Sequence, residues 1–213
     1  MTHNHRVDNP KIHWTSNWTL TAPNTLTVAD TVINMVNKPI ENVQVVRVRT
    51  QEDLEATIYL FHEYIQWLDL DLAFQGLDVE MSSMPGKYAP PRGELLLAKD
   101  ISCGALGCVA IRPLSEQVCE MKRLYVVNAA KGLGIGRRLV TAVIKIAFDI
   151  GYQEIRLDTL PRMTAALAIY RSCGFVEIPA YYNTPLPDTH FLSLDLSRDN
   201  ADLQTRLSQY DLS

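Results

Sequence analysis

The stretch Lys131–Val140, "KGLGIGRRLV", places three glycines at alternate positions directly before a predicted helix. The first N–H groups of a helix have no backbone partner and lie at the positive end of its dipole, so they attract anions. Glycine lets the backbone turn sharply and approach an anion without an intervening Cβ. With Lys131, Arg137 and Arg138 adding positive charge, the stretch predicts a phosphate or pyrophosphate site. The alternative is a tight strand-to-helix turn that binds nothing.

The glycine spacing argues against two common nucleotide loops. A dinucleotide-binding loop requires G-x-G-x-x-G, but Arg137 lies three residues after Gly134 and Leu139 lies three residues after Gly136. A P-loop requires G-x-x-x-x-G-K-[ST], and no Gly-Lys-Ser/Thr occurs in the chain. The predicted phosphate ligand is therefore neither a dinucleotide nor a nucleoside triphosphate.

Apolar periodicity around this stretch predicts a single α/β domain. Thr50, a hydroxyl cap followed by acidic residues, begins a predicted amphipathic helix that extends to Leu68. A second helix runs from Ile135 to Ile150, and a short third covers 164–173. Strands are predicted at 43–50, 94–100, 104–114, 118–127, 154–160, 175–178 and 190–196, with those between 94 and 127 antiparallel. The domain spans 43–196, between a polar extension at 1–42 and a tail at 197–213. Residues 69–92 are less regular and are expected to hold an irregular helix before a Pro/Gly loop.

Composition limits the classes of function. The chain has 213 residues and a net charge of −4, which argues against general binding to nucleic acid or to anionic membranes. It contains no apolar run long enough for a membrane span and no signal-peptide pattern, so we expect a cytoplasmic protein. The four cysteines form no C-x-x-C pair and lack ligand spacing with the histidines, which predicts reduced thiols and no metal site. The extension either packs over the core through Trp14 and Trp18 or is disordered.

The pattern that fits the glycine stretch is [QR]-x-x-G-x-[GA], with Lys131 in the first place. This segment resembles the pyrophosphate loop of the GNAT superfamily of acetyl-CoA-dependent N-acetyltransferases. "EMKRLYV" before it and "AIYRSCGF" after it resemble the central strand and the Y-x-x-x-G-F segment of that family. The resemblance covers about 43–196 and implies an α/β (α+β) fold whose mixed, mostly antiparallel sheet is splayed at its centre and flanked by helices. Two departures are Lys131, where Gln or Arg is usual, and Met163, where many members have Asn.

The resemblance implies that acetyl-CoA binds the chain in two places. Backbone freed where the central strands splay apart, after the "LYV" position, is expected to bind the thioester and pantetheine, with the Val126 N–H at the carbonyl oxygen. The glycine loop is expected to bind the pyrophosphate. The implied cofactor-binding residues are Leu124, Tyr125, Val126, Lys131, Gly132, Leu133, Gly134, Ile135, Gly136 and Arg137.

The resemblance also implies two catalytic residues. Tyr170 is placed like the tyrosine that protonates or hydrogen-bonds the departing thiolate, and a phenol is a credible donor to a thiolate. Glu120 is placed like the glutamate that deprotonates the acceptor amine through water. A packed tyrosine and a structural acid are the respective alternatives. Cys119 is not expected to act as a nucleophile, because direct transfer needs none and strand alternation points it away from the face of Glu120.

Three tyrosines lie in proline-containing loops that are expected to cover the strand ends: Tyr88, Tyr181 and Tyr182. Aromatic side chains on stiff loops suit a small pocket, so we expect them to bind the acceptor, with local packing as the alternative. The predicted reaction is acetyl transfer to a primary amine of a small molecule. A protein or peptide N-acetyltransferase and a non-catalytic CoA-binding sensor are the rival hypotheses, and a homodimer is left open.

Overall fold

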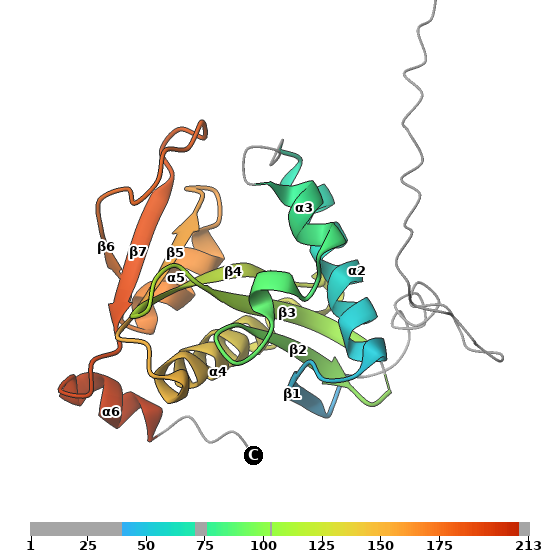
Figure 1. Cartoon of the computed structure of the whole chain (residues 1–213). Helices are drawn as coiled ribbons and strands as arrows, with labels where there is room; N and C mark the ends of the chain where they lie inside the picture. The colour runs from blue at the N-terminus through green and yellow to red at the C-terminus, as the bar shows by residue number, and fades with distance from the viewer. Residues whose placement is uncertain (1–39, 71–75, 103, 209–213) are drawn as a thin grey trace, which may run out of the picture.

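A computed structural model describes residues 40–70, 76–102 and 104–208, so nearly all of the predicted N-terminal extension, including Trp14 and Trp18, lies outside the described residues. A seven-stranded sheet forms the centre of the fold, in the order β1-β2-β3-β4-β5-β7-β6 (Figure 1). The strands are β1 Val43–Arg47, β2 Glu94–Asp100, β3 Gly104–Pro113, β4 Val118–Val126, β5 Glu154–Thr159, β6 Val176–Glu177 and β7 His190–Asp195. All neighbours pair antiparallel except β4 and β5, which are parallel. The predicted mixed, mostly antiparallel sheet is confirmed.

The parallel pair opens soon after it begins. β4 and β5 pair only from Val118 opposite Glu154 to Glu120 opposite Arg156, although both strands continue beyond this point. The sheet is therefore splayed at its centre. The divergence starts before Leu124, earlier along β4 than the resemblance implied.

A β-bulge lies on β4 directly beyond the point of divergence. Tyr125 pairs with Cys108 and Lys122 with Ala110, so two residues of β4 stand opposite one residue of β3. Arg123, one of these two, has a φ of 59°, in the left-handed region that non-glycine residues rarely occupy. Bulges re-aim side chains and occur often beside active sites.

The predicted helices form with their expected ends. The first, α2 (Gln51–Leu68), begins at Thr50, whose hydroxyl accepts a hydrogen bond from the Asp53 N–H at 3.1 Å. The second, α4 (Ile135–Ile150), is bounded by Gly134 and Gly151, both in left-handed conformations. The third is α5 (Thr164–Ser172). Helices α4 and α5 pack on one face of the sheet, while α2 lies against the other (Figure 1).

The irregular helix expected within 69–92 is α3 (Leu77–Ser82), which is followed by the 3₁₀ turn η3 (Gly86–Tyr88). The C-terminal segment holds a helix that the sequence pattern did not predict. The predicted tail contains α6 (Ala201–Leu207), which begins where the Asn200 side chain accepts a hydrogen bond from the Leu203 N–H at 3.0 Å. Leu203 is 1% exposed and belongs to the hydrophobic core, so this helix is packed against the domain. Within the described ranges, none of the helices combines the length and the apolar character needed to cross a bilayer.

Candidate active site

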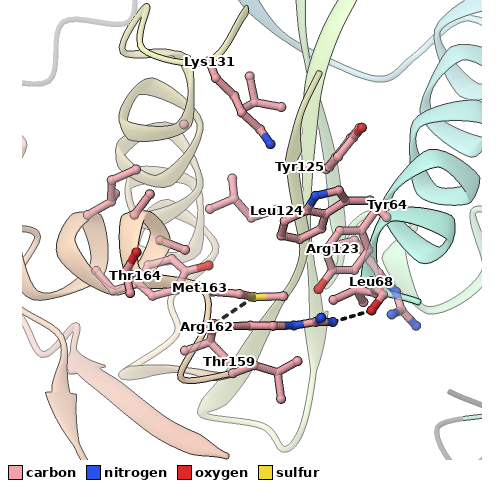
Figure 2. A pocket seen from close by; sticks show the side chains of 18 of the residues that line it. Tyr64, Leu68, Arg123, Leu124, Tyr125, Lys131, Thr159, Arg162, Met163 and Thr164 are labelled. Carbon is pink, nitrogen blue, oxygen red and sulfur yellow. Dashed lines mark hydrogen bonds between the residues drawn. The ribbon is translucent and has the colours of Figure 1, made fainter. Parts of the chain in front are cut away.

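A cleft of about 610 Å³ lies at the opening of the sheet. Its walls come from α2, from the part of β4 beyond Glu120, from the glycine loop, and from the segment that joins β5 to α5 (Figure 2). Lys131 lies towards one end of the view, and Arg162 crosses towards α2 at the other (Figure 2). The cleft therefore connects the predicted phosphate site with the splayed strands.

The glycine loop has the conformation that its composition predicts. Gly132 and Gly134 have φ values of 83° and 77°, which glycine adopts without strain. A Cβ at Gly132 or Gly134 would meet no atom within 4 Å, so these two glycines are required by conformation and not by crowding. Gly136 differs, because a Cβ there would lie 3.2 Å from Ile169 Cδ1 on α5. The N–H groups at the start of α4 are thus left open to an anion beside the cleft.

Nine of the ten predicted cofactor-binding residues line the cleft, and the exception is Leu133, whose side chain is half exposed. The Lys131 ammonium lies 5.0 Å from the centre of the Trp67 ring, a cation–π distance. Arg137 donates a hydrogen bond to Ser172 Oγ at 2.7 Å, which holds its guanidinium beside α5. Both cations are fixed at the end of the cleft where the glycine loop lies.

The edge of β4 that faces the opening offers unpaired backbone. The Val127 N–H donates to the Leu106 carbonyl of the β3 side at 3.0 Å. Because hydrogen-bonding direction alternates along an antiparallel strand, the Val126 N–H points away from β3 and towards the open side. This is the donor that the resemblance implied for the thioester carbonyl.

Tyr170 lines the cleft and is only 6% exposed. Burial, with smaller effects from Tyr64 and Asp158, raises its pKa well above the ordinary value of a tyrosine. Tyr64 of α2 also lines the cleft, and burial raises its pKa to about 12, although Arg123 opposes the shift. Both phenols are neutral hydrogen-bond donors at physiological pH.

Glu120 does not line the cleft. Its side chain is 1% exposed, and its Oε2 accepts a hydrogen bond from Arg112 Nε at 2.8 Å and forms an ion pair with Arg112 Nη2 at 2.7 Å. Its Oε1 accepts from the Tyr181 hydroxyl at 2.8 Å. These contacts hold the carboxylate away from the cleft, so Glu120 has no direct access to an acceptor there.

The three tyrosines predicted to bind the acceptor also lie outside the cleft lining. Tyr88 is 2% exposed and meets the Phe61 ring edge-on at 6.1 Å. Tyr181 and Tyr182 pack edge-on with each other and with Phe191, at centroid distances of 5.2–5.3 Å. Their predicted role stays a prediction, and their contacts here are with the protein itself.

Cys119, the neighbour of Glu120, is fully buried on the other side of the strand and does not line the cleft. Burial raises the pKa of its thiol, whereas a nucleophilic cysteine needs a lowered one. No group of three or more His, Cys, Asp or Glu side chains within the described part of the chain could hold a metal ion.

Sequence reasoning missed the polar groups at the end of the cleft away from the glycine loop. Lys122 Nζ and Asp158 Oδ1 form an ion pair at 2.8 Å, and both residues line the cleft. Arg123 Nε donates to Glu80 Oε1 at 2.8 Å, and an Arg162 nitrogen donates to the Leu68 carbonyl (Figure 2). Lys122 and Arg123 lie within "EMKRLYV", and Asp158 lies in the predicted strand at 154–160, but no local pattern assigned these side chains a role.

Comparison with known proteins agrees with this geometry. The model of the Acetyltransferase (GNAT) family matches residues 59–175. An uncharacterized N-acetyltransferase of Schizosaccharomyces pombe is 38% identical over 158 residues, which covers 74% of this chain and 97% of that protein.

Solved structures share the fold. An acetyltransferase of the GNAT family from Staphylococcus aureus superposes with a TM-score of 0.61 at 19% identity, covering 73% of this chain and 100% of that one. Spermidine N-acetyltransferase from Vibrio cholerae, in complex with CoA and spermine, has a TM-score of 0.54 at 16% identity, with 72% and 95% covered. The family uses acetyl-CoA as its acetyl donor. The chain belongs to the GNAT family and is an N-acetyltransferase.

Proposed function

We propose that this enzyme transfers the acetyl group of acetyl-CoA directly to a primary amine of a small molecule. The observation that carries the proposal is the cleft of about 610 Å³, which joins an anion-binding helix start to buried polar side chains across the opened sheet. Its volume lies in the range of small-molecule pockets, about 300–1,000 Å³. The described cysteines Cys108, Cys119 and Cys173 do not line it, which supports transfer without a thiol intermediate.

Acetyl-CoA would bind with its pyrophosphate at the start of α4 and its pantetheine along the open edge of β4. The backbone N–H groups of Ile135 and Gly136 and the side chains of Lys131 and Arg137 supply the positive potential for the phosphates. The Val126 N–H donates to the thioester carbonyl oxygen. As the amine attacks, this oxygen gains negative charge, and a donor already in place stabilises it.

Tyr170 is assigned to the departing sulfur. The amine nitrogen forms a bond to the carbonyl carbon, the carbon–sulfur bond breaks, and the electron pair leaves on the CoA thiolate. Because burial raises the pKa of Tyr170, the phenol stabilises the thiolate chiefly by donating a hydrogen bond. The thiolate then takes up a proton from solvent, which balances the proton that the amine loses.

The amine must be neutral before it attacks. Five cationic side chains line the described part of the cleft (Lys122, Arg123, Lys131, Arg137 and Arg162) against one carboxylate, Asp158. Excess positive charge disfavours the ammonium form and lowers the pKa of a bound amine. We assign Asp158 to accept the amine proton, directly or through water. Glu120, the base implied by the resemblance, would act indirectly, through its hydrogen bond with Tyr181.

One experiment separates this proposal from its two rivals. Purified enzyme is mixed with acetyl-CoA and a panel of small primary amines and peptides, and thiol release is followed. Turnover with small amines supports the proposal, and turnover confined to peptides supports a peptide acceptor. Tight acetyl-CoA binding without turnover of any acceptor supports the CoA sensor.

A further inference from the structure

We infer that the acceptor carries a carboxylate in addition to its amine, and that Arg123 and Arg162 bind this carboxylate. The inference rests on the proposed function, because it specifies the substrate class of the same cleft. Three observations carry it: an unpartnered guanidinium nitrogen, an arginine without a carboxylate partner, and the charge of this end of the cleft.

Arg123 has a buried donor with no partner. Its side chain is 2% exposed, and while Nε is bound to Glu80, Nη2 is buried and has no hydrogen-bond partner. Buried charged donors are almost always paired, because leaving one unpaired is costly in free energy. Arg123 also occupies the bulge with its left-handed φ of 59°, and it lines the cleft. The protein thus holds a strained residue in the wall of the cleft with one buried guanidinium nitrogen left unpaired.

Arg162 belongs to the segment between β5 and α5, and its side chain extends across the cleft towards α2 (Figure 2). One of its nitrogens donates to the Leu68 carbonyl at the end of α2, which fixes the direction of the side chain (Figure 2). In the part of the chain that the structure describes, Arg162 forms no ion pair with a carboxylate. Its remaining donors are available to a ligand in the cleft.

The charge of this region fits one added anion. The cations Lys122, Arg123 and Arg162 stand against two carboxylates, Asp158 bound to Lys122 and Glu80 bound to Arg123. The Glu120–Arg112 pair nearby is neutral as a unit. Three positive charges against two negative charges leave one positive charge, carried by Arg162. A single carboxylate would neutralise it, whereas a polycation would add to it.

The chemistry of arginine favours a carboxylate as that anion. The planar guanidinium presents its N–H groups in a fork that matches the two oxygens of a carboxylate. A second arginine on the opposite wall can hold the same group from another side. The acceptor is therefore expected to be an amino acid or an amine with a similar acidic group.

The test compares matched acceptors and matched variants. Amino acids with α-, β- and γ-amino groups are assayed beside their carboxamides, which keep the amine and lose the negative charge. We expect the carboxylate member of the preferred pair to have a kcat/KM higher by roughly ten-fold or more, the effect of a hydrogen bond to a charged group.

Arg162→Gln and Arg123→Lys should lower kcat/KM for the carboxylate acceptor by roughly ten- to hundred-fold. The same variants should change the value for the carboxamide by less than about three-fold, and leave KM for acetyl-CoA unchanged. Arg123→Lys keeps a cation beside Glu80. If Arg123→Lys does not fold, Arg162→Gln still provides an independent test. Arg171→Gln, which removes an exposed ion pair with Glu177 outside the cleft, is the matched control.

The outcomes are distinct. Equal turnover of acid and carboxamide, or equal losses on both in the variants, overturns the inference while leaving small-molecule acetylation intact. Absence of turnover with every small amine overturns the proposed function and this inference with it. A selective loss on the carboxylate acceptor in either variant, with the control unchanged, supports the assignment.

Discussion

Replacement of Gly134 by alanine tests the phosphate role of the glycine loop. Gly134 has a φ of 77° and a ψ of 0° at the start of α4, and a Cβ there meets no atom within 4 Å. The cost of Gly134→Ala therefore comes from the left-handed conformation, about 1–2 kcal/mol for an L-residue. In a domain of this size, that cost lowers Tm by roughly 2–8 °C.

The same strain should weaken acetyl-CoA binding. If the backbone relaxes out of the left-handed region, the N–H groups of Ile135 and Gly136 turn away from the pyrophosphate. A loss of about 1.4 kcal/mol corresponds to a ten-fold higher Kd, and we expect a change of about that size. Isothermal titration calorimetry measures it directly, with acetyl-pantetheine as the ligand that lacks the phosphates. Affinity for acetyl-pantetheine should not change.

Gly151→Ala is the matched control. Gly151 ends the same helix with a φ of 100°, and a Cβ there also meets open space within 4 Å. Its substitution should lower Tm through similar strain but leave the Kd of acetyl-CoA unchanged. The reasoning is refuted if Gly134→Ala weakens acetyl-pantetheine as much as acetyl-CoA, or if both glycine variants weaken acetyl-CoA equally.

Four further predictions concern the chemistry and the stability. Tyr170→Phe should lower kcat by about 100-fold with little change in the Kd of acetyl-CoA, measured by single-turnover kinetics and calorimetry, and an unchanged kcat removes the residue from the mechanism. Asp158→Asn should lower kcat by about 100-fold at neutral pH. The kcat of this variant should rise again with pH, because more of the acceptor amine is then already neutral and needs no base. In Glu120→Gln, kcat should still fall as pH is lowered, as it does in the unmodified enzyme. If this dependence of kcat on pH is lost in Glu120→Gln, the base is Glu120. Hydrogen bonds from the Ser102 hydroxyl and from backbone N–H groups hold the pKa of Asp100 well below its ordinary value. The ionised carboxylate therefore stabilises the folded state above the unfolded pKa of about 3.9, and this stabilisation is lost as pH falls. Asp100→Asn should therefore narrow the difference in Tm between neutral pH and about pH 3, and an unchanged difference contradicts the assignment.

Most of the fold was predictable because its signals are local. Thr50 caps α2, Gly151 ends α4, and alternating or continuous apolar segments mark β2 to β5 within one or two residues. The helix α6 was not predicted, although the Asn200 side chain caps its first turn and Leu203 packs into the hydrophobic core. A helix of seven residues has little stability of its own, and its packing against the core is not visible in its own pattern.

The two halves of the site differed in how far the sequence could predict them. The cofactor half is built from consecutive residues around Gly134, so its spacing could be compared with known loops. The acceptor half joins residues that are far apart in the chain, as in the Glu80–Arg123 ion pair and the hydrogen bond from Arg162 to Leu68. A bulge turns Arg123 into this region, and no local pattern identifies a bulge of that kind. The sequence therefore predicted residues of the cofactor half that line the cleft, whereas the tyrosines it assigned to the acceptor (Tyr88, Tyr181 and Tyr182) do not line it.

The opening of the sheet explains why both halves meet at one place. After Glu120 and Arg156 the parallel ladder stops, and the positions two residues further, Lys122 and Asp158, are joined by an ion pair at 2.8 Å instead of a backbone ladder. Long side chains can bridge a wider gap than a ladder hydrogen bond, so the strands stay connected while they separate. The Val126 N–H is then left unpaired at the open edge, and such a donor favours a ligand that restores its hydrogen bond. A ligand that binds only the folded state also stabilises it, so acetyl-CoA that completes this edge should raise Tm with its concentration.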